Sequence, residues 1–144
     1  MKRALFDVNV LIALLDAAHV HHAEATAWLQ RHLLHGWASC PITQIGCVRI
    51  MSQPAYPGAV TASDIAGRLA EACAHEAHAF WPADVDLAGE GAARWSQVLG
   101  HRQVTDTYLL ALAVHHGGRF VTFDARIGLQ AVPGARKEHL VVLR

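Results

Sequence analysis

The chain has 144 residues, of which 53% are apolar and 17% are charged. This balance excludes a disordered chain and predicts one globular domain over residues 1–144, long enough to bury roughly two-thirds of its unfolded surface. Twelve basic and twelve acidic residues give a formal net charge of zero, so no whole-molecule field attracts a nucleic acid. Any contact with nucleic acid must therefore come from local basic residues.

Cysteine usage and the amino-terminal segment indicate the compartment. Cys40, Cys47 and Cys73 are an odd number of cysteines with no C-x-x-C pair, which predicts reduced thiols in a reducing compartment. Asp7 and Asp16 interrupt the first apolar residues, which therefore do not resemble a secretory signal. No stretch reaches the roughly 18 uninterrupted apolar residues that a membrane helix needs. We expect a soluble, cytoplasmic protein with no membrane partner.

Short apolar runs alternate with longer amphipathic segments along the chain. In chain order we predict a strand at residues 3–7, helices at 10–15 and 21–35, a strand at 37–41, helices at 43–52 and 62–75, a strand at 79–81, helices at 87–99 and 105–116, and strands at 119–124 and 139–143. The predicted strands are apolar without alternation, which is typical of strands covered on both faces. The pattern predicts an α/β fold, a three-layer α/β/α sandwich with a central parallel sheet of about five strands.

Three acidic residues stand at the ends or starts of predicted elements. Asp7 ends the first strand, Asp124 ends the fourth, and Asp106 lies in the first turn of the helix at residues 105–116. In such a fold these positions meet at one crevice, so we expect the three carboxylates at a common site. Each acid also has a simpler explanation on its own: Asp7 as a helix cap, Asp106 as a helix stabiliser, and Asp124 as a turn residue.

Neighbouring carboxylates repel one another unless a cation lies between them. Mg²⁺ and Mn²⁺ prefer oxygen ligands of this kind, together with water and phosphate oxygens. We therefore expect Asp7, Asp106 and Asp124 to be catalytic metal ligands, with a phosphodiester as the substrate and hydrolysis by activated water as the reaction. We expect Asn9 and Thr122 to orient the carboxylates through hydrogen bonds.

Four motifs carry a resemblance to a known family. They are LFDVN at residues 5–9, TQIGCVRI at 43–50, TDTYLLALA at 105–113 and FVTFD at 120–124. Their order and spacing over nearly the whole chain resemble a PIN-domain ribonuclease toxin of the VapC type. The resemblance implies a PIN fold and a Mg²⁺-dependent endoribonuclease that is the toxin of a toxin–antitoxin pair. It also implies a homodimer, an RNA substrate and a VapB-like antitoxin that blocks the active site.

The resemblance assigns residues only where the motifs match. Asp7, Asp106 and Asp124 match three acidic positions of the family, and Asn9 matches the polar residue after the first acid. The chain departs from the pattern in the motif at residues 43–50. Many relatives place a Glu a few residues before the Arg that matches Arg49, whereas this chain has Gln44 and Gly46.

The missing Glu bears on the number of metal ions. A carboxamide can bind a metal through its oxygen but brings no charge, so a second ion should be held more weakly at Gln44, or only with RNA present. Mechanisms with one ion and with two ions both stay open at this point.

Basic and aromatic residues give weaker signals. Arg49, Arg102 and Arg126 follow or flank the acidic motifs, so we expect them to contact RNA phosphates, with solvated surface bases as the alternative. The chain has eleven histidines, and we expect surface side chains, some of which can bind Ni²⁺ or Zn²⁺ during purification. Clusters such as His115 and His116 lie outside the predicted acidic edge, and no H-E-x-x-H motif occurs.

Two other functions compete with a ribonuclease. The first is a non-catalytic module that keeps a PIN-like fold and binds RNA or protein, which the missing Glu favours. The second is a phosphatase similar to the haloacid dehalogenases, because Asp7, Val8 and Asn9 follow a strand as that family's first motif does. Asn9 replaces the expected general acid, which argues against the phosphatase. Loss of Mg²⁺ or Mn²⁺ binding on Asp7→Asn would separate a nuclease from a binding module.

Overall fold

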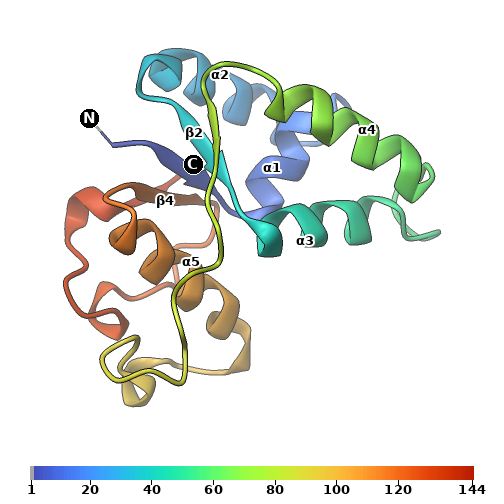
Figure 1. Cartoon of the computed structure of the whole chain (residues 1–144). Helices are drawn as coiled ribbons and strands as arrows, with labels where there is room; N and C mark the ends of the chain where they lie inside the picture. The colour runs from blue at the N-terminus through green and yellow to red at the C-terminus, as the bar shows by residue number, and fades with distance from the viewer. Residues whose placement is uncertain (1) are drawn as a thin grey trace.

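A five-stranded, all-parallel sheet forms the centre of the computed structural model, which describes residues 2–144 (Figure 1). The strands are β1 (Ala4–Phe6), β2 (Trp37–Ser39), β3 (His78–Phe80), β4 (Arg119–Thr122) and β5 (Leu140–Val142). Their order across the sheet is β3-β2-β1-β4-β5, so the chain builds one side of β1 first and the other side afterwards. This order makes β1 and β4 direct neighbours, and the carboxyl ends of both strands lie at the same edge.

Helices cover both faces of the sheet. They are α1 (Val8–Leu15), α2 (His22–His32), α3 (Pro41–Met51), α4 (Ala62–Cys73) and α5 (Val104–His115). The first four helices contribute to the core on one face, and α5 packs against the other face (Figure 1). The predicted three-layer α/β/α sandwich with a parallel five-stranded sheet is confirmed.

The two faces of β1 belong to two different cores. Phe6 points into the core under α1 and α2, where its ring meets Trp28 edge-on at a centroid distance of 5.9 Å. Leu5 points into the opposite core, together with Phe120 and the buried middle of α5. Strands buried on both faces read as uninterrupted apolar runs, which is why the runs in the sequence predict them correctly.

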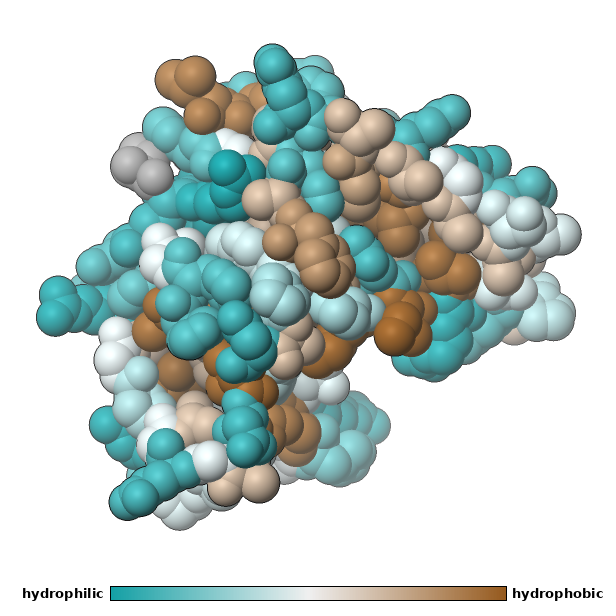
Figure 2. All heavy atoms as spheres, viewed as in Figure 1, coloured by the Kyte–Doolittle hydropathy of each residue, from teal (hydrophilic) through white to brown (hydrophobic). Residues whose placement is uncertain are grey.

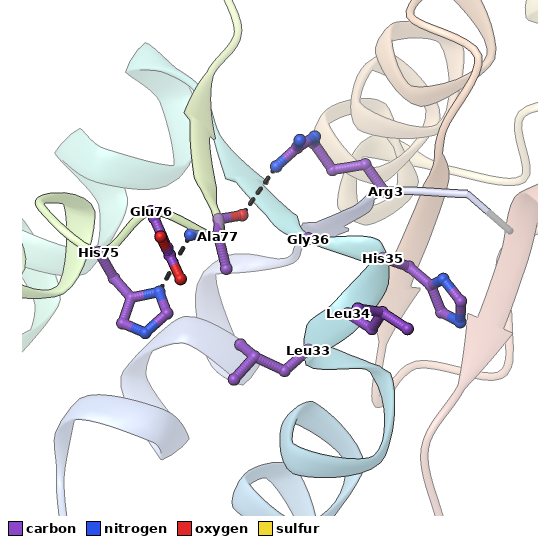
Figure 3. A pocket seen from close by; sticks show the side chains of 8 residues that line it. All are labelled: Arg3, Leu33, Leu34, His35, Gly36, His75, Glu76 and Ala77. Carbon is purple, nitrogen blue, oxygen red and sulfur yellow. Dashed lines mark hydrogen bonds between the residues drawn. The ribbon is translucent and has the colours of Figure 1, made fainter.

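At the amino edge of the sheet, Arg3 joins three strands. Its guanidinium donates to the backbone oxygen of Ala77 at 2.7 Å (Figure 3) and to that of Trp37 at 3.1 Å. Gly36 lies directly beside this guanidinium and has a φ of 78°, a conformation that side chains rarely adopt. Residue 36 therefore has to be a glycine, because its φ is unfavourable for other residues and because a side chain would collide with the Arg3 guanidinium.

A second glycine lets two helices approach closely. Gly46 of α3 is buried against Val8 of α1, and a Cβ atom at residue 46 would lie 2.8 Å from Val8 Cγ2. Val8 is β-branched and stiff at χ1, so it cannot turn aside at low cost. The close contact between α1 and α3 therefore depends on the missing side chain.

The helix predicted at residues 87–99 is wrong. The chain from Trp81 to Gly100 is mostly irregular, with 3-10 turns at Trp95–Gln97 and, just beyond, at His101–Gln103. Gly89 closes a turn on the backbone oxygen of Asp86, and Gly91 has a φ of 81°. Two glycines so close together favour turns over a helix, and they outweigh the apolar residues in this segment.

The other predicted elements are present, with ends within two residues of those expected. One exception is the predicted helix at 21–35, whose last three residues form a 3-10 turn, Leu33–His35. Two helices begin two residues earlier than predicted, because Asp7 caps α1 and Pro41 occupies the first turn of α3. None of the helices in residues 2–144 combines the length and apolar character needed to span a membrane.

The packing of Gly46 generates a stability prediction. Gly46→Ala should lower the free energy of unfolding by about 1–3 kcal/mol, because overpacking against Val8 outweighs the gain in helix propensity. The matched control is Gly67→Ala in α4, where no atom lies within 4 Å of an added Cβ. This control should raise stability by about 0.5–1 kcal/mol. Urea unfolding followed by circular dichroism measures both, and equal stabilisation by the two variants would contradict the packing argument.

Candidate active site

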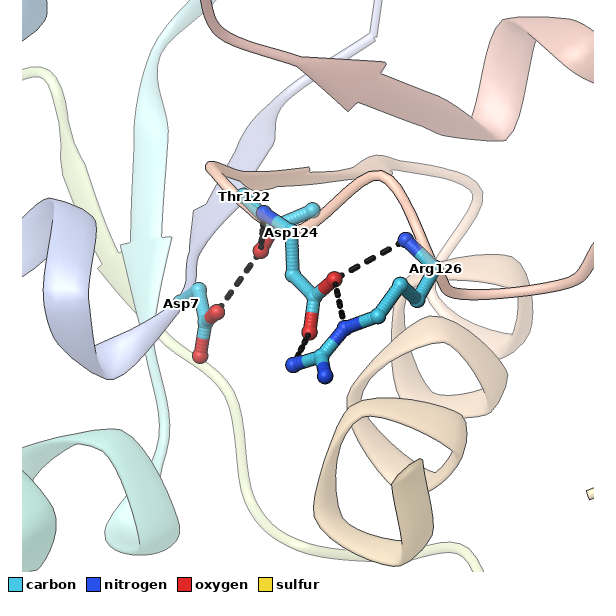
Figure 4. Close-up of polar contacts among 4 residues, drawn as sticks. All are labelled: Asp7, Thr122, Asp124 and Arg126. Carbon is cyan, nitrogen blue, oxygen red and sulfur yellow. Dashed lines mark hydrogen bonds and ion pairs between the residues drawn. The ribbon is translucent and has the colours of Figure 1, made fainter. Parts of the chain in front are cut away.

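Acidic side chains meet at the carboxyl edge of the sheet, as the topology predicts. Asp7 follows β1 directly, Asp124 lies two residues beyond β4, and Asp106 lies in the first turn of α5. Figure 4 shows Asp7 and Asp124 on either side of Thr122, the last residue of β4. The three predicted acids thus come from three separate elements at one edge.

Asp7 is buried and has hydrogen bonds on both carboxylate oxygens. It is only 7% exposed, accepts the backbone N–H of Val8 on Oδ1 at 2.7 Å, and accepts the hydroxyl of Thr122 on Oδ2 at 2.7 Å. Burial raises the pKa of Asp7 above its ordinary value, and these two hydrogen bonds partly oppose the shift. Asp7 therefore does cap α1, through one carboxylate oxygen, and its carboxylate lies at the acidic site as well.

Thr122 connects two of the acids. Its fully buried hydroxyl donates to Asp7, and the same oxygen accepts the backbone N–H of Asp124 at 3.1 Å (Figure 4). This is the geometry that an orienting role needs. Asn9 is exposed in the first turn of α1, and among residues 2–144 it forms no hydrogen bond with the three acids.

Asp124 is paired with Arg126. Its carboxylate accepts the Nε and Nη2 atoms of Arg126 and the backbone N–H of the same residue, each at 2.9 Å (Figure 4). These contacts with Arg126 hold the pKa of Asp124 below its ordinary value. Arg126, which the sequence suggests for RNA phosphates, instead lies on one of the acids in this structure.

Asp106 is the acid whose charge is least compensated. Burial, followed by the charges of Asp7 and Asp124, raises its pKa to about 7. Nearby carboxylates disfavour each other's ionisation, so the charges of Asp7 and Asp124 add to the effect of burial. Without a cation, Asp106 is therefore partly protonated near pH 7.

The donor set fits a hard divalent cation. All three side chains offer oxygen atoms only, and their combined negative charge exceeds what Arg126 compensates. Within residues 2–144, however, the ligand atoms of these acids are not all within 4.8 Å of one another. Pairing with Arg126 commits the Asp124 carboxylate, so direct coordination by all three acids requires that this side chain be released.

Gln44 and Gly46 differ in what they can contribute. The Gln44 amide donates to the Ser39 hydroxyl at 3.0 Å, and that hydroxyl lies 2.8 Å from Nε2 of His78. Gly46 faces Val8 and has no room for a side chain. No motif in the sequence predicts the Ser39–His78 contact, although Ser39 ends β2 just as Asp7 follows β1.

The two remaining candidate arginines are exposed. Arg49 lines a groove between α3 and α4, and Arg102 lies in the 3-10 turn immediately before α5. Neither forms an ion pair within the part of the chain that the structure describes, from residue 2 onward. Both cations are therefore open to a ligand from outside.

Comparisons with known proteins agree with this architecture. The PIN domain family model matches residues 4–134. Ribonuclease VapC44 of Mycobacterium tuberculosis is 51% identical over 98% of this chain and 99% of its own, and Ribonuclease VapC39 of the same organism is 46% identical over 91% and 95%.

Two solved structures share the fold at low identity. The sarcin-ricin loop cleaving toxin VapC20 of M. tuberculosis has a TM-score of 0.58 at 16% identity and covers 85% of this chain and 91% of its own. VapBC2 of Rickettsia felis, bound to a DNA fragment from its promoter, has a TM-score of 0.63 at 10% identity and covers 98% of both chains.

The raised pKa of Asp106 predicts how stability depends on pH. The pKa of Asp106 is about 7 in the folded protein, above its ordinary value of 3.8. Its contribution to the free energy of unfolding is therefore fully present below pH 3.8 and is lost as the pH rises through about 7. In metal-free protein, Asp106→Asn should therefore be more stable than the parent at pH 8. The gain should be about 1–2 kcal/mol after allowing for solvent screening at this half-buried position.

Urea unfolding in the presence of a chelator, at about pH 5 and about pH 8, measures this difference. The gap between variant and parent should widen at the higher pH. Glu71→Gln, which alters an exposed acid on α4, is the control and should follow the parent at both values. A gap that stays constant would show that Asp106 is not destabilised by its neighbours.

Proposed function

Because the chain belongs to the VapC family of PIN-domain ribonucleases, we propose that it is the cytoplasmic toxin of a toxin–antitoxin pair and cleaves RNA at the carboxyl edge of its sheet. The observation that carries this site is the shared environment of Asp7, Asp106 and Asp124. Their mutual repulsion, visible in the pKa of Asp106, suits a site that works with a cation.

We assign the metal site to the same three acids, with Mg²⁺ as the ion and Mn²⁺ as a substitute. When bound, the ion supplies positive charge that favours ionisation of the attacking water and offsets the charge developing on the phosphate. Oxygen ligands and high negative charge support a hard cation over a soft one. The family supports metal dependence in general, and Mg²⁺ is our choice within it.

The chain's own residues prepare this site in two ways. Thr122 and the backbone N–H of Val8 hold the Asp7 carboxylate in one orientation, so it needs no rearrangement when a ligand arrives. With a pKa of about 7, Asp106 is partly protonated at neutral pH in the metal-free state and must release that proton as the cation binds. A higher pH should therefore favour the loaded site.

RNA would approach past exposed cations. We propose that Arg102, just before α5, and Arg49, on α3, contact phosphates on either side of the acids. Arg126 is held by Asp124, so it can contact a phosphate only after that ion pair opens. The two exposed arginines are thus the better candidates.

One metal ion is the simpler mechanism for this chain. The Gln44 amide is already hydrogen-bonded to Ser39, and residue 46 has no room for a side chain. Neither position therefore adds a charged ligand beside the acids. This favours one firmly held ion over two.

We propose a VapB-like antitoxin as the protein partner. An apolar groove of about 640 Å³ between α3 and α4 suits an apolar segment of that partner, and its lining includes Ile45, Val48 and Leu69. Apolar residues gather over these two helices in Figure 2. Gln44 also lines this groove, so a bound segment could continue over the acids and place a basic side chain there. Homodimerisation stays a prediction from the family.

The phosphatase and the non-catalytic binding module have less support than a ribonuclease. A PIN match over residues 4–134 argues against a haloacid-dehalogenase-like phosphatase. The relatives that match nearly the full chain are ribonucleases by name, which argues against a module without catalytic activity.

Removing one carboxylate charge tests the site directly. Asp7→Asn, Asp106→Asn and Asp124→Asn should each lower RNA cleavage by about 100-fold or more, because each removes charge that the cation and the reaction need. Asn keeps the helix-capping ability of Asp7, so that variant should remain folded. Asp64→Asn on α4 is the exposed control. Full activity in any two of the three site variants, in preparations free of host ribonuclease, would overturn the assignment.

Gln44 offers a test of the number of ions. Gln44→Glu should lower the Mg²⁺ concentration for half-maximal cleavage, because the added carboxylate would strengthen a second ion site. Gln53→Glu, at an exposed position after α3, is the matched control for added charge. If both variants keep the parental Mg²⁺ dependence, residue 44 takes no part in metal binding, while the assignment of the three acids stands.

A further inference from the structure

A second group of metal-ligating side chains lies outside the acidic site. Within residues 2–144, one set of three His, Cys, Asp or Glu side chains has its ligand atoms all within 4.8 Å of one another: Asp84, His115 and His116. The two histidines end α5, whereas Asp106 lies in the first turn of that helix. The two groups are therefore at opposite ends of α5, about 15 Å apart along its axis.

Both imidazoles face the same carboxylate. His116 Nε2 lies 2.9 Å from Asp84 Oδ1, and His115 Nε2 lies 3.6 Å from Asp84 Oδ2. The His116 ring is also stacked on Trp81, with the planes 11° apart and the centroids 4.6 Å apart. Trp81 is itself buried, so it fixes the His116 ring in place. The ligand atoms are thus held together before any ion arrives.

Further carboxylates line the hollow beside this group. Asp84 and His115 line a hollow of about 420 Å³ that also includes Asp86 and Glu90. Two imidazole nitrogens with a carboxylate oxygen suit Zn²⁺, Ni²⁺ or Co²⁺, whereas Mg²⁺ prefers a set made of oxygen alone. The chemistry of this group therefore differs from that of Asp7, Asp106 and Asp124.

The position of the group suggests what an ion would do there. Asp84 belongs to the irregular connection between β3 and α5, while both histidines belong to the end of α5. The contacts of Asp84 with the two histidines join this connection to the end of the helix. A metal ion shared by the two segments would close a loop of about 30 residues and restrict the unfolded chain.

We propose that Asp84, His115 and His116 bind a divalent transition-metal ion, with Zn²⁺ as the probe, and that this ion fastens the β3–α5 connection to the end of α5. The site is structural and separate from RNA cleavage. It does not depend on the proposed ribonuclease function, so either conclusion can fail without the other.

Calorimetric titration of the whole protein with Zn²⁺, in excess Mg²⁺, tests the site. His115→Ala and Asp84→Asn should each weaken binding at the tightest site by at least about tenfold, since loss of even an outer partner of a metal site costs about 10–100-fold. The control is the double variant His19→Ala/His21→Ala, which removes two other neighbouring histidines and should keep the parental affinity. Asp7→Asn/Asp106→Asn should also keep it, because its changes lie in the acidic site.

Two readouts other than cleavage support the interpretation. Ni²⁺ should quench tryptophan fluorescence in the parent, and Trp81→Phe should remove most of that quenching, because Trp81 stacks on a ligand. Zn²⁺ should raise the thermal midpoint of the parent and leave that of His115→Ala unchanged. Parental Zn²⁺ affinity in both His115→Ala and Asp84→Asn would overturn the site. Binding without a rise in the midpoint would overturn its fastening role.

Discussion

The hydrogen bond from Thr122 to Asp7 ties the fold to the site. It joins the ends of β1 and β4, two strands that are far apart in the sequence and adjacent in the sheet. The register that pairs Phe6 with Val121 places the hydroxyl beside the carboxylate, and a slip by one residue would turn Thr122 to the other face. Because Phe6 and Val121 are buried in the same core, the packing that sets the register also positions the acid.

Charge balance explains the rest of the carboxyl edge. Three acids meet there, and within residues 2–144 the cation that forms an ion pair with one of them is Arg126, which lies on Asp124. Hydrogen bonds satisfy the buried Asp7, while Asp106 is left with burial and two negative neighbours. Without metal, repulsion among the acids is reduced because one of them is paired and another is partly protonated near pH 7. The electrostatic strain is thus concentrated on Asp106, at the start of α5.

Much of this structure could be predicted from local patterns. Uninterrupted apolar runs identified all five strands, and the rule that ligands bind at carboxyl ends brought Asp7, Asp106 and Asp124 together. Contacts that depend on irregular backbone could not be predicted in this way. The Arg126 side chain returns to Asp124 through a turn, and Asp84 reaches His116 across 32 residues from the connection between the strand predicted at 79–81 and the helix predicted at 87–99. In the sequence, Gly46 stands where many relatives have a Glu that could bind metal. The close approach of Val8 in the structure shows that this glycine is required for packing.

The two roles of Asp7 have a consequence for how sequences in this family diverge. The residue begins α1 as well as lining the site, so a descendant that lost nuclease activity would still be selected for a capping side chain at residue 7. Asp, Asn, Ser or Thr would persist there after the chemistry had gone. Asp124, which caps no helix, is free of that constraint. In a lineage that loses nuclease activity, substitutions would therefore appear at residue 124 before residue 7.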